Sequence, residues 1–386
     1  MLDLRITDVK TYIVPPSFEK RPDKWCDNKM YLFIKLETDK GIDGWGEAYV
    51  LRDRERNIAL HVQELKRYLV GFDPSNIKYF QHWAYEVYAQ SRPGIDLYCA
   101  LSGIEIAMWD IMGKYYNTPV YNLLGGPVHT KLRLYANLSS NDYKSPEEVA
   151  QYAKEIVKMG FTALKIYPFD FNEEDEVIVE RVAKTREAIG NKVDLMLDIW
   201  RRTDPVKAVS VAKKLEPMNV VWYEEPIPSE NLETIAEIRK QVSVPIVIGE
   251  CICGKRSYFN VLKAGAADIL NADVCVAGGI LELKEIASMA EANYIKIGPH
   301  NCNSTTIGTS ATAHAACTMP NFHILEIFPS YWEIGEKLCK NQLRMHDGYF
   351  YLPEGPGLGL EMNEDFIAAQ EYKARPTRSL NIETVL

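Results

Sequence analysis

Three short apolar runs that each end on an acidic residue constrain the fold of this chain more than any other feature. The runs are VDLMLD, VVWYE and PIVIGE, which end at Asp198, Glu224 and Glu250. Each interval between successive acids is 26 residues long, about the length that a strand, a helix and two short loops require. The spacing therefore predicts three successive strand–helix units, each with an acid at an equivalent strand end.

Equivalent strand ends share one face of a parallel barrel, and that face carries the chemistry. Three carboxylates that converge there without cysteine or histidine suit a hard cation such as Mg²⁺. A single acid at a strand end is more often a helix N-cap or a solvated residue, but three acids in register favour a shared role. We therefore expect Asp198, Glu224 and Glu250 to bind one Mg²⁺ per chain.

The next two apolar runs add a base beside this expected metal site. ILNAD ends at Asp273 and IKIGPH ends at His300, 23 and 27 residues further along the chain. A histidine whose ring is oriented by a carboxylate is suited to proton transfer near neutral pH. An isolated histidine at a strand end is more often structural, yet the acids on the preceding strands favour a dyad of Asp273 and His300.

Strands and helices alternate from about residue 132 to residue 328, whereas the preceding residues follow a different order. We expect eight strands in the alternating part, which indicates a barrel because an open doubly wound sheet usually has fewer. One of its helices begins with the capping box Ser145-Pro146-Glu147-Glu148. Residues 6–49 are expected to form strands, and helices are expected over Glu55–Leu69, Ile77–Tyr88 and Leu97–Tyr116, which describes an α+β unit.

Composition argues against several kinds of partner. The net charge is −9, so a polyanionic nucleic acid is not expected. No apolar run reaches the roughly 18 residues needed to cross a membrane. The first residues, MLDLRITDVKTYIV, lack the pattern of a signal peptide. The eight cysteines, several of them inside apolar runs, indicate reduced thiols in a cytoplasmic protein.

Two short motifs suggest further sites only weakly. Cys251 and Cys253 form a C-x-C pair, but no second pair at zinc-ligand spacing accompanies it. Gly278-Gly279 is expected to open a helix, which weakly suggests an anion site.

Several longer motifs give the chain a family resemblance that covers nearly all of its length. They are, in order, LKIYP around Lys165, WYEEP around Glu224, NADVCVAGGI from Asn271, GPHN around His300, HILEIF around Glu326 and PGLGLEM from Pro356. With these motifs the chain resembles the enolase superfamily, in its mandelate racemase-like branch. The resemblance implies an α/β fold, a (β/α)7β TIM-like barrel with an α+β capping domain. It also implies that Asp198, Glu224 and Glu250 are the Mg²⁺ ligands and that Asp273 and His300 are the catalytic dyad.

The resemblance further implies a division of the chain. Residues 1–126, completed by about 355–386, would form the capping domain, and residues 127–354 the catalytic barrel. In the family, loops of the capping domain close over the barrel mouth and contact the substrate, and here these would be Pro16–Met30 and Leu51–Arg56. Trp25 and Arg52 lie in these loops as candidate substrate-binding residues, with an ordinary surface position as the alternative.

The second barrel strand carries Lys165 and Tyr167, which face the same way because they are two residues apart. Racemases of the resembled branch have a lysine at the second position, whereas tyrosine, with an ordinary pKa of about 10, is a weak base. The resemblance implies that Lys165 binds the substrate carboxylate and that Glu326 hydrogen-bonds the enediolate. Trp200 is a candidate for shaping the pocket, and Arg202, with its neighbour Arg201, for pairing with substrate groups or simply for solvation.

Together these features predict an Mg²⁺-dependent dehydratase of a sugar acid, an aldonate or an aldarate. Such an enzyme abstracts the proton alpha to the carboxylate and eliminates the beta-hydroxyl, giving a 2-keto-3-deoxy acid. The alternatives are a racemase or epimerase of a 2-hydroxy acid, a cycloisomerase, and a metal-binding barrel without activity. The expected partners are a small-molecule carboxylate and further copies of the chain in a homo-oligomer, but neither nucleic acid nor a membrane.

Overall fold

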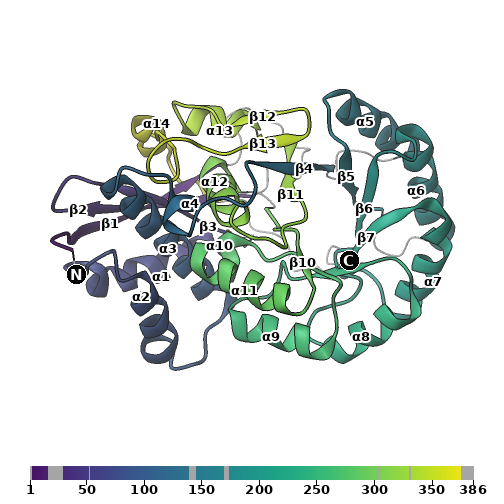
Figure 1. The fold of residues 1–386 in the computed structure, drawn as a ribbon, viewed down its shortest axis with the longest axis horizontal. Helices are drawn as coiled ribbons and strands as arrows, with labels where there is room; N and C mark the ends of the chain where they lie inside the picture. Colours follow the sequence, from purple (N-terminus) through teal and green to yellow (C-terminus); the bar gives the residue numbers. More distant parts are fainter. Residues whose placement is uncertain are drawn as a thin grey trace.

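The computed structural model describes residues 2–15, 29–51, 53–138, 145–168, 174–301, 304–329 and 332–374, without the side chains of residues 332 and 333. Two groups of elements lie side by side, a small sheet covered by helices and a larger ring of strands surrounded by helices (Figure 1). The first group is the capping domain, meaning here the elements from β1 to α3, and the second is the barrel. Every helix among the described residues is too short or too polar to span a membrane.

The capping domain is an antiparallel sheet with the strand order β1-β2-β3, packed against helices. Its elements are β1 (Ile6–Val14), β2 (Tyr31–Thr38), β3 (Gly44–Ala48), α1 (Glu55–Leu69), α2 (Ile77–Trp83), the π-helical turn η2 (Ala84–Tyr88) and α3 (Ile95–Tyr115). Glycines allow α3 to lie directly on β3, since a Cβ at Gly46 would come within 1.8 Å of the Gly103 carbonyl oxygen. The expected long helix over residues 77–88 is in fact α2 followed by a π-helical turn.

The barrel contains eight parallel strands, β4 to β11, joined in sequence order. They are β4 (Lys131–Leu138), β5 (Ala163–Ile166), β6 (Asp194–Asp198), β7 (Val220–Glu224), β8 (Ile246–Ile248), β9 (Ile269–Leu270), β10 (Lys296–Ile297) and β11 (Leu325–Ile327). The ring closes because β11 pairs with β4 and because the His323 N–H donates to the Ile297 carbonyl at 2.7 Å. The predicted (β/α)7β barrel is therefore confirmed.

The barrel helices surround the strands (Figure 1). They are α5 (Pro146–Lys158), α6 (Asp175–Ile189), α7 (Pro205–Leu215) with the 3-10 turn η4 (Glu216–Met218), α8 (Leu232–Gln241), α9 (Lys255–Ala264), α10 (Val274–Ala277), α11 (Ile280–Ala292) and α12 (Thr306–Ala316). The capping box predicted at Ser145 begins α5: the Ser145 hydroxyl accepts the Glu148 N–H, and the Glu148 carboxylate accepts the Ser145 N–H.

Two of the three acid-bearing runs form strands that extend as far as the acid itself. The strands of the later runs end before the residues at which the sequence predicted them to end. Asp198 and Glu224 end β6 and β7. Glu250 lies two residues beyond β8, while Asp273 and His300 each lie three residues beyond their strands. Gly249 turns the chain there with a φ of 149°, and a Cβ on it would meet the Asn271 Oδ1 at 2.9 Å. The strand ends are therefore extended by tight loops that carry these three side chains.

The C-terminal segment returns from the barrel to the capping domain. After α13 (Trp332–Leu338), β12 (Arg344–His346) and β13 (Tyr349–Tyr351) form a hairpin that pairs with the start of β4. The Leu358 N–H then donates to Asp110 on α3 at 2.9 Å. Glu364 of α14 (Glu364–Ala368) pairs with Lys35 of β2 at 2.8 Å. The short helix α4 (Val120–Leu123) links the two groups near this segment.

Candidate active site

The fully buried ammonium of Lys165 joins three of the predicted site acids at the strand ends. Its Nζ lies 2.8 Å from Glu224, 3.0 Å from Glu326 and 3.6 Å from Asp198. Burial alone would lower the pKa of Lys165, but the negative charges of Glu224 and Glu326 raise it well above its usual value. Lys165 is therefore held as a cation among carboxylates, and its predicted contact with a substrate carboxylate stays a prediction.

The acids Asp198 and Glu224 carry more negative charge than Lys165 alone compensates. Burial raises the pKa of Asp198 to about 6, with the Glu250 charge adding to this and Lys165 opposing it. Burial also raises the pKa of Glu224, although Lys165 again opposes it. Both Glu224 oxygens have further donors, Trp222 Nε1 at 2.6 Å and Asn271 Nδ2 at 2.8 Å. These contacts fix the carboxylate while leaving its charge available to a cation.

The carboxylate of Glu250 bridges to the predicted dyad. One of its oxygens accepts from Arg201, and the other lies 3.1 Å from His300 Nε2. His300 Nδ1 lies 2.8 Å from Asp273 Oδ2, and the other Asp273 oxygen accepts the Cys275 N–H at 2.7 Å. Burial would raise the pKa of Glu250, but the hydrogen bond from His300 and the charge of Arg201 hold it well below its usual range.

The residues at these strand ends have the chemistry that a divalent cation requires. Within the described residues, ligand atoms of Glu224, Glu250 and His300 all lie within 4.8 Å of one another. Asp198 is linked to this group by Lys165, whose Nζ lies 3.6 Å from the Asp198 carboxylate. The Asp198 Oδ1 accepts the Trp200 N–H at 2.8 Å. Buried carboxylates with incomplete charge compensation fit a hard cation. The predicted roles of Asp198, Glu224 and Glu250 as the metal ligands all stay predictions.

The predicted residues Tyr167 and Glu326 are connected through an asparagine. Asn137 Nδ2 at the end of β4 donates to the Tyr167 hydroxyl oxygen at 3.0 Å and to Glu326 at 2.5 Å. The second Glu326 oxygen accepts the Asn301 N–H at 2.9 Å. Burial would raise the pKa of Glu326, but the charges of Lys165 and His300 together with the hydrogen bonds from Asn301 and Asn137 lower it. Tyr167 and His300 thus lie on either side of Glu326.

The four predicted substrate-binding residues divide into two pairs. Trp25 and Arg52 lie outside the described residues, as does most of the loop Pro16–Met30. Trp200 and Arg202 lie in the turn after β6, where the Arg202 guanidinium is 4.7 Å from the centre of the Trp200 ring. Trp200 is 40% exposed and has a φ of 47°, a left-handed conformation that side chains other than glycine seldom adopt. The turn is held because the Arg201 N–H donates to the Glu225 carbonyl at 2.7 Å.

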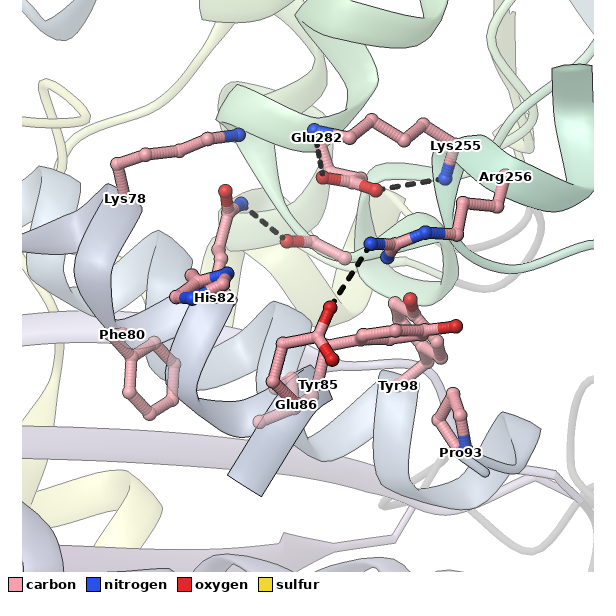
Figure 2. A pocket seen from close by; sticks show the side chains of 13 residues that line it. Lys78, Phe80, His82, Tyr85, Glu86, Pro93, Tyr98, Lys255, Arg256 and Glu282 are labelled. Atoms are coloured by element: carbon pink, nitrogen blue, oxygen red, sulfur yellow. Dashed lines mark hydrogen bonds and ion pairs between the residues drawn. The ribbon is translucent and has the colours of Figure 1, made fainter. Parts of the chain in front are cut away.

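A second cavity lies away from the strand ends, at the junction of the capping domain with α9 and α11 (Figure 2). The cationic side chains that line it are paired: Arg256 with Glu86 at 3.2 Å and Lys78 with Glu285 at 2.5 Å across the junction, and Lys255 with Glu285 within the barrel. Because these charges balance one another, the cavity marks a contact between the two domains rather than a ligand site.

Several residues that hold the site were missed by sequence reasoning. Trp222 lies two residues before Glu224 on the same strand, so the period of two should have placed its indole beside that carboxylate. Asn137 and Asn271 lie at strand ends, but an asparagine there has many ordinary roles. Arg201 was expected to pair with a substrate group or with solvent, and in the structure it pairs with Glu250.

Comparison with known proteins places this geometry in a family. Residues 8–125 match the model of the mandelate racemase/muconate lactonizing enzyme N-terminal domain, and residues 148–366 match that of the enolase C-terminal domain-like family. The chain therefore belongs to the mandelate racemase/muconate lactonizing enzyme family of the enolase superfamily.

Individual relatives resemble the chain over nearly its whole length. It is 33% identical to the D-galactonate dehydratase of Pectobacterium atrosepticum over 97% of both chains. It is also 33% identical to that of Ralstonia pickettii, again over 97% of both. A mandelate racemase/muconate lactonizing enzyme from Sulfitobacter has a solved structure with a TM-score of 0.89, 30% identity and 97% coverage of both chains.

Proposed function

We propose that the chain is an Mg²⁺-dependent dehydratase of a sugar acid, an aldonate or an aldarate. The observation that carries the proposal is the placement of the His300–Asp273 pair, with His300 Nε2 3.1 Å from Glu250 in the acidic group at the strand ends. The whole-length similarity to two D-galactonate dehydratases supports the class of reaction.

The proposed metal ligands are Asp198, Glu224 and Glu250, with one cation per chain. When bound, the cation supplies electrostatic stabilisation for the negative charge that develops on the substrate carboxyl oxygens. Lys165 contributes a fixed positive charge beside the same carboxylates. Arg201 pairs with Glu250 and limits the repulsion among the acids.

The proposed base is His300, acting through Nε2 because Nδ1 is directed at Asp273. Nε2 takes the proton from C2 of the substrate, and the electron pair of that C–H bond forms the C2–C1 double bond of the enediolate. Asp273 stabilises the imidazolium that results and keeps the ring in one orientation. Glu326, fixed by Asn137 and Asn301, is the proposed hydrogen-bond partner of the enediolate.

Elimination completes the reaction. The electron pair of the C1–C2 double bond moves to form a C2–C3 double bond as the C3–O bond breaks. The electrons of the C3–O bond leave with the hydroxyl group, which takes a proton from His300 or from Tyr167 and departs as water. The remaining enol takes up a proton at C3, loses the proton of its C2 hydroxyl and becomes the 2-keto-3-deoxy acid. A racemase would need a second efficient base on the opposite face of the substrate, and Tyr167 occupies the position where racemases of this branch have a lysine, so dehydration is the better fit.

The experiment that tests the proposal is a screen of acid sugars with Mg²⁺ in deuterated water. We expect a 2-keto-3-deoxy acid labelled at C3, together with recovered substrate that keeps its configuration at C2. Inverted substrate without keto acid across a broad panel would instead establish a racemase. No conversion of any acid sugar, with Mg²⁺ bound, would favour the alternative of a barrel without activity.

We also propose that the chain divides as the sequence suggested, into residues 1–126 with about 355–386 and residues 127–354. The contacts of Leu358 and Glu364 with α3 and β2 support assigning the C-terminal segment to the capping domain. Limited proteolysis should cut first near the two proposed boundaries, and a single cut inside the barrel would contradict the division.

A further inference from the structure

Two barrel helices receive their N-terminal hydrogen-bond acceptors from the capping domain. Glu105 on α3 accepts the Ile280 N–H at 2.7 Å and the Leu281 N–H at 2.9 Å, in the first turn of α11. Glu47 on β3 accepts the Thr305 N–H at 2.9 Å and the Gly308 N–H at 2.8 Å, at the start of α12. These two helices follow the strands that lead to Asp273 and His300.

Neither helix caps itself in the usual way, and this explains why the carboxylates come from another domain. The first N–H groups of a helix have no partner within it and are usually satisfied by a side chain of the preceding residue. At α11 that residue is Gly279, which has no side chain, and a Cβ there would lie 2.1 Å from a Glu105 oxygen. The Gly278-Gly279 motif therefore does open an anion site, and its anion is the carboxylate of Glu105.

At α12 the preceding residue is Thr305, whose hydroxyl could serve as a cap but is used differently. It donates a hydrogen bond to Glu47 Oε2 at 2.7 Å instead of accepting one from its own helix. Glu47 thus accepts hydrogen bonds from the Thr305 hydroxyl and from two backbone N–H groups, and it is only 2% exposed. The contact spans 258 residues of sequence.

The end of β3 also lies against the dyad itself. The Tyr49 N–H, two residues after Glu47, donates to the Cys275 carbonyl at 3.2 Å. The centre of the Tyr49 ring is 6.4 Å from that of His300. One short stretch of the capping domain, from Glu47 to Tyr49, therefore contacts the chain just after Asp273 and just after His300.

The two members of the dyad depend differently on these contacts. Asp273 is the N-cap of α10, where its own carboxylate accepts the Cys275 N–H, so it is fixed locally. His300 lies in the loop between β10 and α12, and Glu47 holds the end of that loop through Thr305. A base must be held to within a fraction of an ångström of its productive position, so a shift of this loop would act on catalysis directly.

We propose that Glu47 is a positioning residue for His300, acting through the Thr305 turn, whereas Glu105 only anchors the capping domain to the barrel. The assignment of His300 as the base rests on the proposed function. The inference goes beyond the proposed function because it assigns the positioning of His300 to Glu47, a capping-domain side chain that does not contact the substrate.

A matched pair of substitutions tests the difference. Glu47→Met and Glu105→Met each remove a buried acceptor of two helix N–H groups, so both should lower the melting temperature. Glu47→Met should lower kcat by about 10²-fold, the cost of a misplacement on the order of 1 Å, with KM changed by no more than about 3-fold. Glu105→Met should keep kcat within about 3-fold of the wild type.

Milder variants keep the test decisive if the methionine variants fold poorly. Glu47→Gln retains one acceptor oxygen and Thr305→Val removes only the hydroxyl contact, so both should lower kcat by roughly 3- to 10-fold. Glu105→Gln is their control and should leave kcat unchanged. Equal losses of kcat in the Glu47 and Glu105 series, or an unchanged kcat in Glu47→Met, would overturn the proposal.

Amide hydrogen exchange provides a readout that does not depend on turnover. In the Glu47 variants exchange should rise over residues 304–310, and in the Glu105 variants over residues 279–284. If the wild type converts no acid sugar, the proposed function fails while exchange still reports whether Glu47 holds the His300 loop. If the wild type is active and the Glu47 variants show neither faster exchange at 304–310 nor lower kcat, the positioning role alone is refuted.

Discussion

The acid side and the dyad side of the barrel mouth are held in different ways. On the acid side, the partners of Asp198, Glu224 and Glu250 within the described residues come from the barrel, namely Lys165, Trp200, Arg201, Trp222, Cys251, Asn271 and the dyad histidine. On the dyad side, the loops that carry Asp273 and His300 also contact Glu47 and Tyr49 of the capping domain.

This difference suggests a separation of tasks. A site for a hard cation needs oxygen atoms at fixed distances, which a rigid barrel can provide from neighbouring strand ends. A base that acts on a substrate must be held in one position, and contacts from outside its own loop help to hold it. We therefore expect changes on the acid side to alter metal binding and stability, and changes on the dyad side to alter turnover.

The largest effect should follow removal of the base. His300→Asn should lower turnover by roughly 10³-fold or more, because general base catalysis is lost. Exchange of the substrate C2 proton with deuterated water, followed by NMR, measures this step without requiring elimination. The exposed His346→Asn substitution is the control. A His300→Asn enzyme that still exchanges the C2 proton at the wild-type rate would exclude His300 as the base.

The next largest effect should come from the acid side. Lys165→Met removes the cation among buried carboxylates and should lower the free energy of unfolding by about 3–5 kcal/mol in urea titrations. Mg²⁺ should restore more stability to this variant than to the wild type, because acids without the Lys165 charge attract the ion more strongly, and a more tightly bound ion stabilises the folded state more at a given concentration. Lys184→Met, which breaks exposed pairs with Glu147 and Glu180, should change little. An unaltered unfolding curve for Lys165→Met would refute the charge balance described here.

A smaller effect is expected from Tyr167, the residue that follows β5. Tyr167→Phe should lower kcat by about 10²-fold if its hydroxyl protonates the leaving group, and Tyr349→Phe on β13 is the control. The C2 exchange rate should be nearly unchanged, because His300 still removes the proton. A kcat within a few fold of the wild type would instead assign both proton transfers to His300.

The last prediction concerns pH and the last turn of α12, the helix that follows the His300 loop. His314 on α12 is fully buried, and burial lowers its pKa from 6.5 to about 4. The unfolded chain therefore binds a proton more readily, so stability is full above pH 6.5 and falls by up to about 3 kcal/mol as the pH drops through 4. His314→Asn, which retains an acceptor for the Tyr121 N–H, should flatten this fall in urea titrations at pH 4 to 7. An equal fall in both proteins would assign the loss to other groups.

Sequence reasoning succeeded where local pattern determines structure. The barrel and its strand-end acids could be predicted from the 26-residue spacing, and the α5 capping box from four consecutive residues, because these features depend on period and local hydrogen bonding. The loops that carry Glu250, Asp273 and His300 were harder to predict from the sequence. The shortening of their strands depends on packing between neighbouring strand ends, as between Gly249 and Asn271.

The contacts between domains could not be read from the sequence. Glu47 and Thr305 are 258 residues apart and Glu105 and Ile280 are 175 apart, so their pairing depends on how the two domains pack. Gly278-Gly279 gave the one local signal, an anion site at a helix start, but not the identity of the anion. Trp25 and Arg52 remain predictions outside the described residues.

The measurement that tests the separation of tasks most directly is calorimetric titration of Mg²⁺ into Asp198→Asn and His300→Asn. Geometry alone groups Glu224 and Glu250 with His300, whereas the proposed ligands are Asp198, Glu224 and Glu250. We predict that Asp198→Asn weakens Mg²⁺ binding by at least about 10-fold, while His300→Asn binds Mg²⁺ as the wild type does. Normal binding by Asp198→Asn, with binding lost in His300→Asn, would contradict the account.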